Sequence, residues 1–144
     1  MESPLYQGES EIREVVARFE NCQYELQEFS HARHLTVACW CLCTMTREEA
    51  QARMGAGLQR FLAHHGREGY HETITRFWML LIADHLHRQS GALSDVQRIN
   101  DVVTRYPKET LFDYYSRDRV ISETAKHDWI EPDLRQITER ESLV

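Results

Sequence analysis

Apolar positions recur along the chain at the spacing of amphipathic helices. Between residues 10 and 21 they fall at Ile12, Val15, Val16 and Phe19, which is the i, i+3, i+4, i+7 pattern of one helical face. Four further segments repeat this period, and they span residues 31–45, 46–65, 71–89 and 94–106. No stretch alternates apolar and polar residues in the way that predicts a β-strand. The pattern therefore predicts an all-α protein.

Capping residues predict where these helices begin and end. Ser10 and Ser30 are suited to be N-caps of the first and second helices. Thr-x-x-Glu at 46–49 and Ser-x-x-Gln at 94–97 are capping boxes for the third and fifth. Gly66 is placed as the residue that follows the third helix.

These segments and a short sixth helix after Pro107 predict one domain, residues 1–144, folded as a bundle of about five to six helices. Residues 1–9 are expected to form a loose N-terminal arm, and residues 132–144 a polar C-terminal tail. A chain of this length can bury a core without disulfides or a structural metal.

Composition and charge argue against two classes of partner. The formal charge is −6 and no cluster of Lys and Arg is present, so a nucleic-acid partner is not expected. No apolar run reaches the roughly 20 residues that span a bilayer, so a membrane is not expected either. The start Met1-Glu2-Ser3-Pro4 lacks the pattern of a signal peptide, which predicts a cytoplasmic location.

Three cysteines in the second helix, Cys39, Cys41 and Cys43, resemble a metal motif only at first sight. Successive helical residues turn by about 100°, so Cys41 points away from the other two. We therefore interpret them as small buried hydrophobic residues in a reducing compartment.

Histidines define the candidate site. His31 and His34 lie one turn apart at the start of the second helix, and His71 with Glu72 begins the fourth. His31, His34 and His71 project onto the apolar stripes of their helices. If these helices pack side by side, three imidazoles converge, and Glu72 and Thr75 lie close enough to join them.

This cluster predicts an enzyme that acts on a small organic molecule. His31, His34 and His71 would bind a divalent metal, zinc or non-haem iron, with an open position for substrate. Glu72 would be a ligand or the base, and Thr75 would orient the substrate or the ring of His71.

Three alternatives to a metal centre stay open. His71, Glu72 and Thr75 can be the catalytic groups of a metal-free lyase, isomerase or cyclase. The same pocket can belong to a non-catalytic module that binds a metabolite. The histidines can also serve only local structure, with Glu72 paired to Arg76 one turn on. A homodimer formed through an exposed apolar helix face is a further alternative.

Glu28, Glu68 and His85 are further candidates for the site. Glu28-x-x-His31 and Glu68-x-x-His71 resemble half of a di-iron bundle pattern, but both glutamates precede their helices, which disfavours that centre. His85 lies on the same apolar stripe as His71 and can hydrogen-bond to a residue of the site without touching the ligand itself.

Most of the chain after residue 19 resembles a family of small, uncharacterised bacterial proteins. The resemblance rests on a Phe-x-His-x-x-His-Leu segment, a Gly-x-x-x-Tyr-His-Glu-Thr segment and a later tryptophan-containing stretch. These are Phe29, His31, His34 and Leu35, then Gly66, Tyr70, His71, Glu72 and Thr73, then Trp78, and residues 122–133. The resemblance implies an all-helical fold and a site at these motifs, and it implies no particular reaction.

Overall fold

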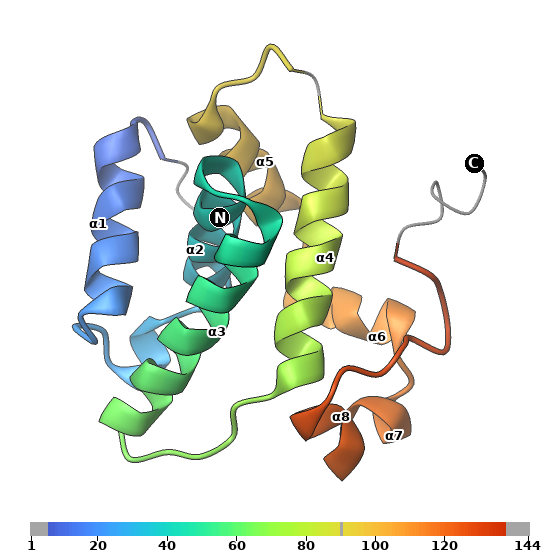
Figure 1. Cartoon of the computed structure of the whole chain (residues 1–144). Helices are drawn as coiled ribbons and strands as arrows, with labels where there is room; N and C mark the ends of the chain where they lie inside the picture. Colours follow the sequence, from blue (N-terminus) through green and yellow to red (C-terminus); the bar gives the residue numbers. More distant parts are fainter. Residues whose placement is uncertain (1–5, 90, 138–144) are drawn as a thin grey trace.

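The computed structural model describes residues 6–89 and 91–137. This part of the chain is helical and contains no strand (Figure 1). Five longer helices come first, and they are α1 (Glu9–Glu20), α2 (His31–Thr44), α3 (Arg47–His64), α4 (Glu72–Arg88) and α5 (Asp95–Arg105). Three short helices follow, which are α6 (Leu111–Tyr114), α7 (Arg117–Val120) and α8 (Glu123–His127). Two 3-10 turns, η1 (Leu26–Glu28) and η2 (Lys108–Thr110), precede α2 and α6.

The all-α prediction is confirmed, but the count of five to six helices is wrong, because the described residues form eight α-helices. The difference arises after Pro107, where the sequence predicts one short helix and the structure contains three. Helices of four or five residues complete little more than one turn, so their apolar period cannot be recognised in the sequence. No helix in the described ranges is long and apolar enough to cross a membrane.

The predicted caps hold at three of the four helix starts. Ser30 accepts the Arg33 N–H, and both capping boxes are formed. Gly66 follows α3 with a φ of 67°, as expected of a residue in the left-handed region. Ser10 is not a cap, because α1 begins at Glu9 and the Glu11 carboxylate accepts the N–H of Gly8.

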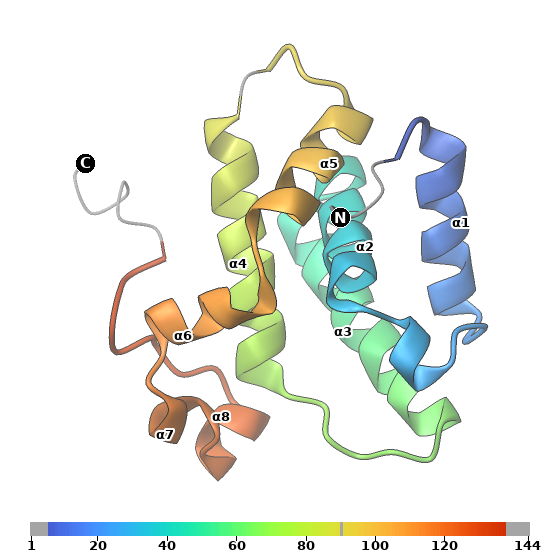
Figure 2. The ribbon, with the colours of Figure 1, turned by 180° about the vertical axis from the view of Figure 1, so that it is seen from behind.

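Helix α2 is the centre of the structure. It contacts α1, α3, α4 and α5 (Figures 1 and 2). A helix surrounded in this way must be apolar on most of its surface. The run from Leu35 to Cys41 is buried accordingly, and it includes Cys39 and Cys41 as small core residues. Cys43 is half-buried.

The two ends of the chain pack more closely than the sequence predicts. Tyr6 lies in the expected loose arm, yet its backbone exchanges two hydrogen bonds of 2.9 Å with the Asn100 side chain. Within the expected polar tail, the Leu134 N–H donates to the Tyr114 carbonyl, and Ile137 is buried. Residues 1–5 and 138–144 of the two segments lie outside the described ranges.

The C-terminal segment with α6, α7 and α8 lies beside the first turns of α4 (Figure 2). Thr73 is fully buried there, and its hydroxyl donates to the Asp128 carbonyl at 2.7 Å and accepts the Ile130 N–H at 3.2 Å. The Tyr115 hydroxyl donates to the Ile130 carbonyl at 2.6 Å. These bonds fix the segment that follows α8 against α4, which carries the candidate site residues.

Gly57 provides a test of the packing between α1 and α3. A Cβ at this position would lie 2.8 Å from Cε2 of Phe19, and Phe19 is held by stacking on Phe29 with ring centroids 4.4 Å apart. Overpacking costs about 1–3 kcal/mol, and the better helix propensity of alanine returns about 1 kcal/mol at most. We expect Gly57→Ala to lower the free energy of unfolding, measured by urea denaturation.

The matched control is Gly91→Ala, because a Cβ at Gly91 meets no atom within 4 Å. Its stability should stay within about 0.5 kcal/mol of the wild type. A Gly57→Ala variant as stable as the Gly91→Ala variant would contradict the close approach of Phe19.

Candidate functional site

His71 is a structural residue of the α4 terminus. It is the N-cap of α4, and its Nδ1 accepts the Ile74 N–H at 3.1 Å. Its Nε2 lies 2.7 Å from the carbonyl oxygen of Val120, which can only accept, so Nε2 carries the proton. Both ring nitrogens are therefore occupied, and neither is available as a metal ligand or as a base.

His31 and His34 line a pocket between the start of α2, the face of α4 that carries Ile74 and Trp78, and the η2–α6 segment. We call it the His34 pocket, and its volume is about 410 Å³. Its walls are mostly apolar or aromatic. The lining residues are Phe29, Ser30, His31, His34, Ile74, Trp78, Lys108, Glu109, Leu111 and Phe112.

The two histidines of this pocket differ in their partners. His31 Nε2 donates to the Tyr106 carbonyl at 2.9 Å, and the edge of its ring packs on Trp78 with centroids 5.0 Å apart. His34 touches the Phe29 ring edge-on, and neither of its ring nitrogens bonds to another described residue. His34 is thus a polar group of the pocket without a partner among the described residues.

Burial sets the charge of both imidazoles. Burial, and to a smaller extent repulsion from His31, lower the pKa of His34 to about 4. Burial also lowers the pKa of His31, against the opposing effect of its bond to the Tyr106 carbonyl. At neutral pH the ring of His34 is therefore uncharged, with one nitrogen as donor and the other as acceptor.

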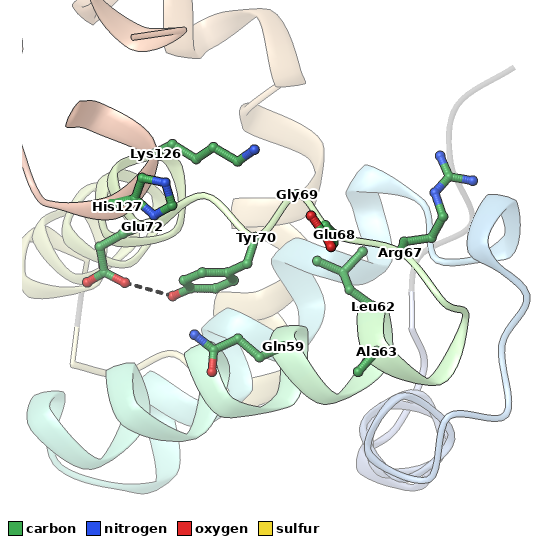
Figure 3. A pocket seen from close by; sticks show the side chains of 10 residues that line it. All are labelled: Gln59, Leu62, Ala63, Arg67, Glu68, Gly69, Tyr70, Glu72, Lys126 and His127. Atoms are coloured by element: carbon green, nitrogen blue, oxygen red, sulfur yellow. Dashed lines mark hydrogen bonds between the residues drawn. The ribbon is translucent and has the colours of Figure 1, made fainter. Parts of the chain in front are cut away.

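Glu72 lies on the opposite side of α4 from the His34 pocket. It precedes Ile74 by two residues, which places it about 160° around the helix. The Tyr70 hydroxyl donates to Glu72 Oε1 at 2.9 Å in a hollow of about 460 Å³, which we call the Tyr70 groove (Figure 3). Burial and then the Glu72 carboxylate raise the pKa of Tyr70 to about 12.

Thr75 lines a second hollow that shares Tyr70 and Glu72 with this groove. Its hydroxyl donates to the backbone carbonyl of His71 at 2.8 Å, so it does not orient the His71 ring as the sequence suggested. Gly55 faces the same hollow, where a Cβ would lie 3.0 Å from the Tyr70 hydroxyl oxygen.

The predicted metal centre is not supported by this geometry. Among the described residues no group of three or more His, Cys, Asp or Glu side chains is placed to hold a metal ion. The prediction projected His71 onto the apolar stripe of the fourth helix, but His71 is the N-cap and lies outside the helical repeat. Its ring therefore turns to Val120 instead of toward His31 and His34.

The further candidates also lie elsewhere. Glu28 closes η1, where its carboxylate accepts the Glu25 N–H at 2.8 Å, and Glu68 lines the Tyr70 groove. The two glutamates therefore do not form a di-iron site with His31 and His71. His85 bonds to Asp101 and Tyr106 in a separate polar cluster. The sequence offered no signal for that cluster, because its members join only when α4 and α5 pack.

Comparison with known proteins identifies no family for this chain. No protein-family model, no curated protein and no solved structure matches the chain. The resemblance to a bacterial family, the cytoplasmic location and the homodimer therefore stay predictions.

Removal of the His71 side chain tests its structural role. His71→Ala loses the cap and the bond to the Val120 carbonyl, and we expect a loss of about 1–3 kcal/mol in the free energy of unfolding. His71→Asn keeps a cap acceptor and should fall between wild type and His71→Ala. Urea denaturation measures the order, and equal stability of all three proteins would contradict the assignment.

Acidification tests the neutral state of His34. The unfolded chain binds a proton at this histidine near pH 6.5, whereas the folded protein does so only near pH 4. Stability is therefore lost as pH falls through this window, and His34 alone accounts for about 2 kcal/mol between pH 7 and pH 5. Denaturation of His34→Gln should show a shallower pH dependence than wild type, whereas His87→Gln, at an exposed site, should not.

Proposed function

We propose that the protein binds a small, largely apolar organic molecule with one uncharged hydrogen-bonding group in the His34 pocket. The observation that carries the proposal is the ring of His34, which is held uncharged among apolar side chains and makes no hydrogen bond to a described residue. The side chain is half-buried and lines the pocket, so a molecule bound there can reach its nitrogens. A ligand hydroxyl, carbonyl or ring N–H can be their hydrogen-bond partner.

The shape and lining of the pocket support this class of ligand. A volume of about 410 Å³ is in the range of small-molecule sites, which are mostly apolar with a few placed polar groups. Trp78 and Phe112 provide aromatic surface for a ring or a short aliphatic body. Lys108 and Glu109 also belong to the lining, so charged groups are available where a ligand carries a second polar substituent.

Binding without turnover is better supported at this pocket than acid–base catalysis. A general base works best when its pKa lies near the operating pH, and His34 with a pKa of about 4 is a weak base. We therefore favour a non-catalytic helical module that binds a metabolite over an enzyme.

The Tyr70 groove supports a second candidate, an acid–base enzyme such as a lyase, isomerase or cyclase. The supporting observation is the 2.9 Å bond between the Tyr70 hydroxyl and the Glu72 carboxylate, which pairs a proton donor with a base at the wall of a hollow (Figure 3). In that case Glu72→Gln removes turnover and His34→Phe does not. The opposite result assigns catalysis to the His34 pocket.

A matched pair of probes tests the binding proposal. 2-Naphthol and naphthalene share their apolar body, and only 2-naphthol can hydrogen-bond to His34. We expect wild type to bind 2-naphthol more tightly by about 2- to 12-fold, the range of one net hydrogen bond of 0.5–1.5 kcal/mol. Ligand-induced shifts of the Trp78 indole N–H signal in NMR titrations measure both affinities, in wild type and in the variants.

His34→Phe keeps an aromatic ring and removes the polar atoms, so this variant should bind the two probes equally. His87→Gln is the control at an exposed histidine and should keep the wild-type preference. Absence of binding by both probes, or a preference for 2-naphthol that survives in His34→Phe, would refute the proposal.

A further inference from the structure

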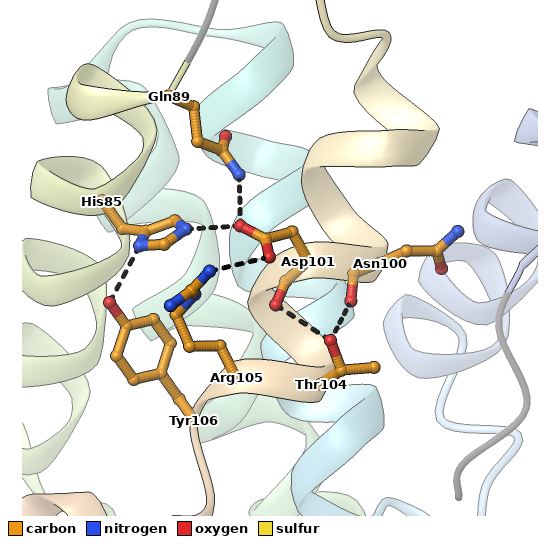
Figure 4. Close-up of polar contacts among 7 residues, drawn as sticks. All are labelled: His85, Gln89, Asn100, Asp101, Thr104, Arg105 and Tyr106. Atoms are coloured by element: carbon orange, nitrogen blue, oxygen red, sulfur yellow. Dashed lines mark hydrogen bonds and ion pairs between the residues drawn. The ribbon is translucent and has the colours of Figure 1, made fainter.

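A second polar site lies where the end of α4 meets the end of α5 (Figure 4). His85 stands between two partners: its Nδ1 lies 2.9 Å from the Tyr106 hydroxyl and its Nε2 lies 2.7 Å from Asp101 Oδ2. Gln89 donates to the same Asp101 oxygen at 2.9 Å, and Arg105 donates to Oδ1 at 3.3 Å. We call the row Tyr106–His85–Asp101 the Tyr106 site.

The positions of the protons follow from the partners. The hydrogen bonds from His85 and Gln89 outweigh the effect of burial and keep the pKa of Asp101 below its ordinary value, so its carboxylate only accepts. His85 therefore carries its proton on Nε2, and its Nδ1 lone pair accepts the O–H of Tyr106. Burial raises the pKa of Tyr106, so its hydroxyl reacts as a nucleophile only with the help of a base. A hydroxyl that donates to a base, which a carboxylate orients from the other side, is the arrangement that provides this help.

This row lines a cavity instead of lying sealed in the core. The cavity has a volume of about 580 Å³ and includes Tyr106, His85 and Asp101 in its wall. Gln89 also lines it, and Gln89 Oε1 is buried without a hydrogen-bond partner among residues 6–89 and 91–137. A row that served only to cross-link α4 and α5 would need neither the cavity nor this unsatisfied acceptor.

The cavity wall also indicates the class of ligand. Arg88 and Arg105 line it with side chains that are 52% and 56% exposed. Each forms one ion pair, Arg88 with Asp84 and Arg105 with Asp101, through a single guanidinium nitrogen. A guanidinium carries five N–H donors, so both keep donors that can bind a carboxylate.

We propose that Tyr106 is the nucleophile of a second site, which accepts an acyl group from a small ester that carries a carboxylate. The Tyr106 oxygen attacks the carbonyl carbon while its proton passes to Nδ1 of His85. The bond from the carbonyl carbon to the leaving oxygen then breaks, and His85 returns the proton to that oxygen, which leaves as the alcohol. Arg88 and Arg105 bind the carboxylate, and Asp101 stabilises the transient imidazolium.

A sulfonyl fluoride that carries a carboxylate tests the reactivity of this hydroxyl. With 4-(fluorosulfonyl)benzoate, the Tyr106 oxygen forms a bond to sulfur, fluoride leaves with the electrons of the S–F bond, and His85 takes the proton. The product is a stable ester that peptide mass spectrometry locates. Tyr6 is the internal reference, because it is half-buried and its hydroxyl bonds to the Thr36 hydroxyl and to no histidine of the described residues.

We expect Tyr106 to be labelled at least about tenfold faster than Tyr6 in the wild-type protein, because general-base assistance contributes about 10²–10⁴-fold. His85→Gln should remove this advantage without changing the labelling of Tyr6. Arg88→Gln leaves the bonds of Asp101 in place, and it should lower the labelling rate of the carboxylate probe relative to that of benzenesulfonyl fluoride, its uncharged analogue.

Three results would overturn the proposal. The first is that Tyr106 is labelled no faster than Tyr6 in the wild-type protein. The second is that Tyr106 is labelled as fast in His85→Gln as in the wild type. The third is that the charged and uncharged probes label Tyr106 at equal rates. The first comparison uses only wild-type protein, so it decides even if a variant fails to fold. Because none of these measurements involves the His34 pocket, failure here leaves the proposed function untouched.

Discussion

Buried hydrogen-bonding groups at the starts of α2 and α4 control how the C-terminal half of the chain is placed. A polar group removed from water must find a partner or cost free energy. His31 finds the Tyr106 carbonyl, His71 finds the Val120 carbonyl, and Thr73 finds backbone groups of Asp128 and Ile130. Because each of these bonds reaches far along the sequence, they hold the segments after α5 against the two helix ends.

His34 differs from these three residues, and the proposed function rests on the difference. The same burial that forces the neighbouring groups to find protein partners leaves this imidazole uncharged and without one among the described residues. The pocket around it lies between the start of α2, α4 and the η2–α6 segment. The fold thus provides a pocket with mostly apolar walls and, in His34, a hydrogen-bonding group without a partner among the described residues.

The segment from Tyr106 to Tyr114 forms a wall shared by two cavities. Lys108, Glu109, Leu111 and Phe112 face the His34 pocket, and Tyr106, Thr110, Asp113 and Tyr114 face the cavity of the Tyr106 site. Tyr106 itself contacts both histidines, His31 through its carbonyl and His85 through its hydroxyl. A short segment without a long helical repeat therefore lines both proposed sites.

The sequence predicted the long helices and most of their caps, because a period of 3.6 residues and a capping box are local signals. It predicted the neighbourhood of His31 and His34 for the same reason. It failed at His71, where one residue of error in the helix start changes the direction of the side chain. It also failed at the Tyr106 site, because His85 and Asp101 meet only through the packing of α4 on α5.

The state of the His34 ring is the most direct test of this account. An NMR titration of its imidazole signals from pH 8 to pH 3.5 measures its pKa in the folded protein. We predict that the ring stays uncharged until the pH approaches 4. Titration near 6.5, the value of an unperturbed histidine, would contradict a buried, uncharged imidazole and with it the pocket on which the proposed function rests.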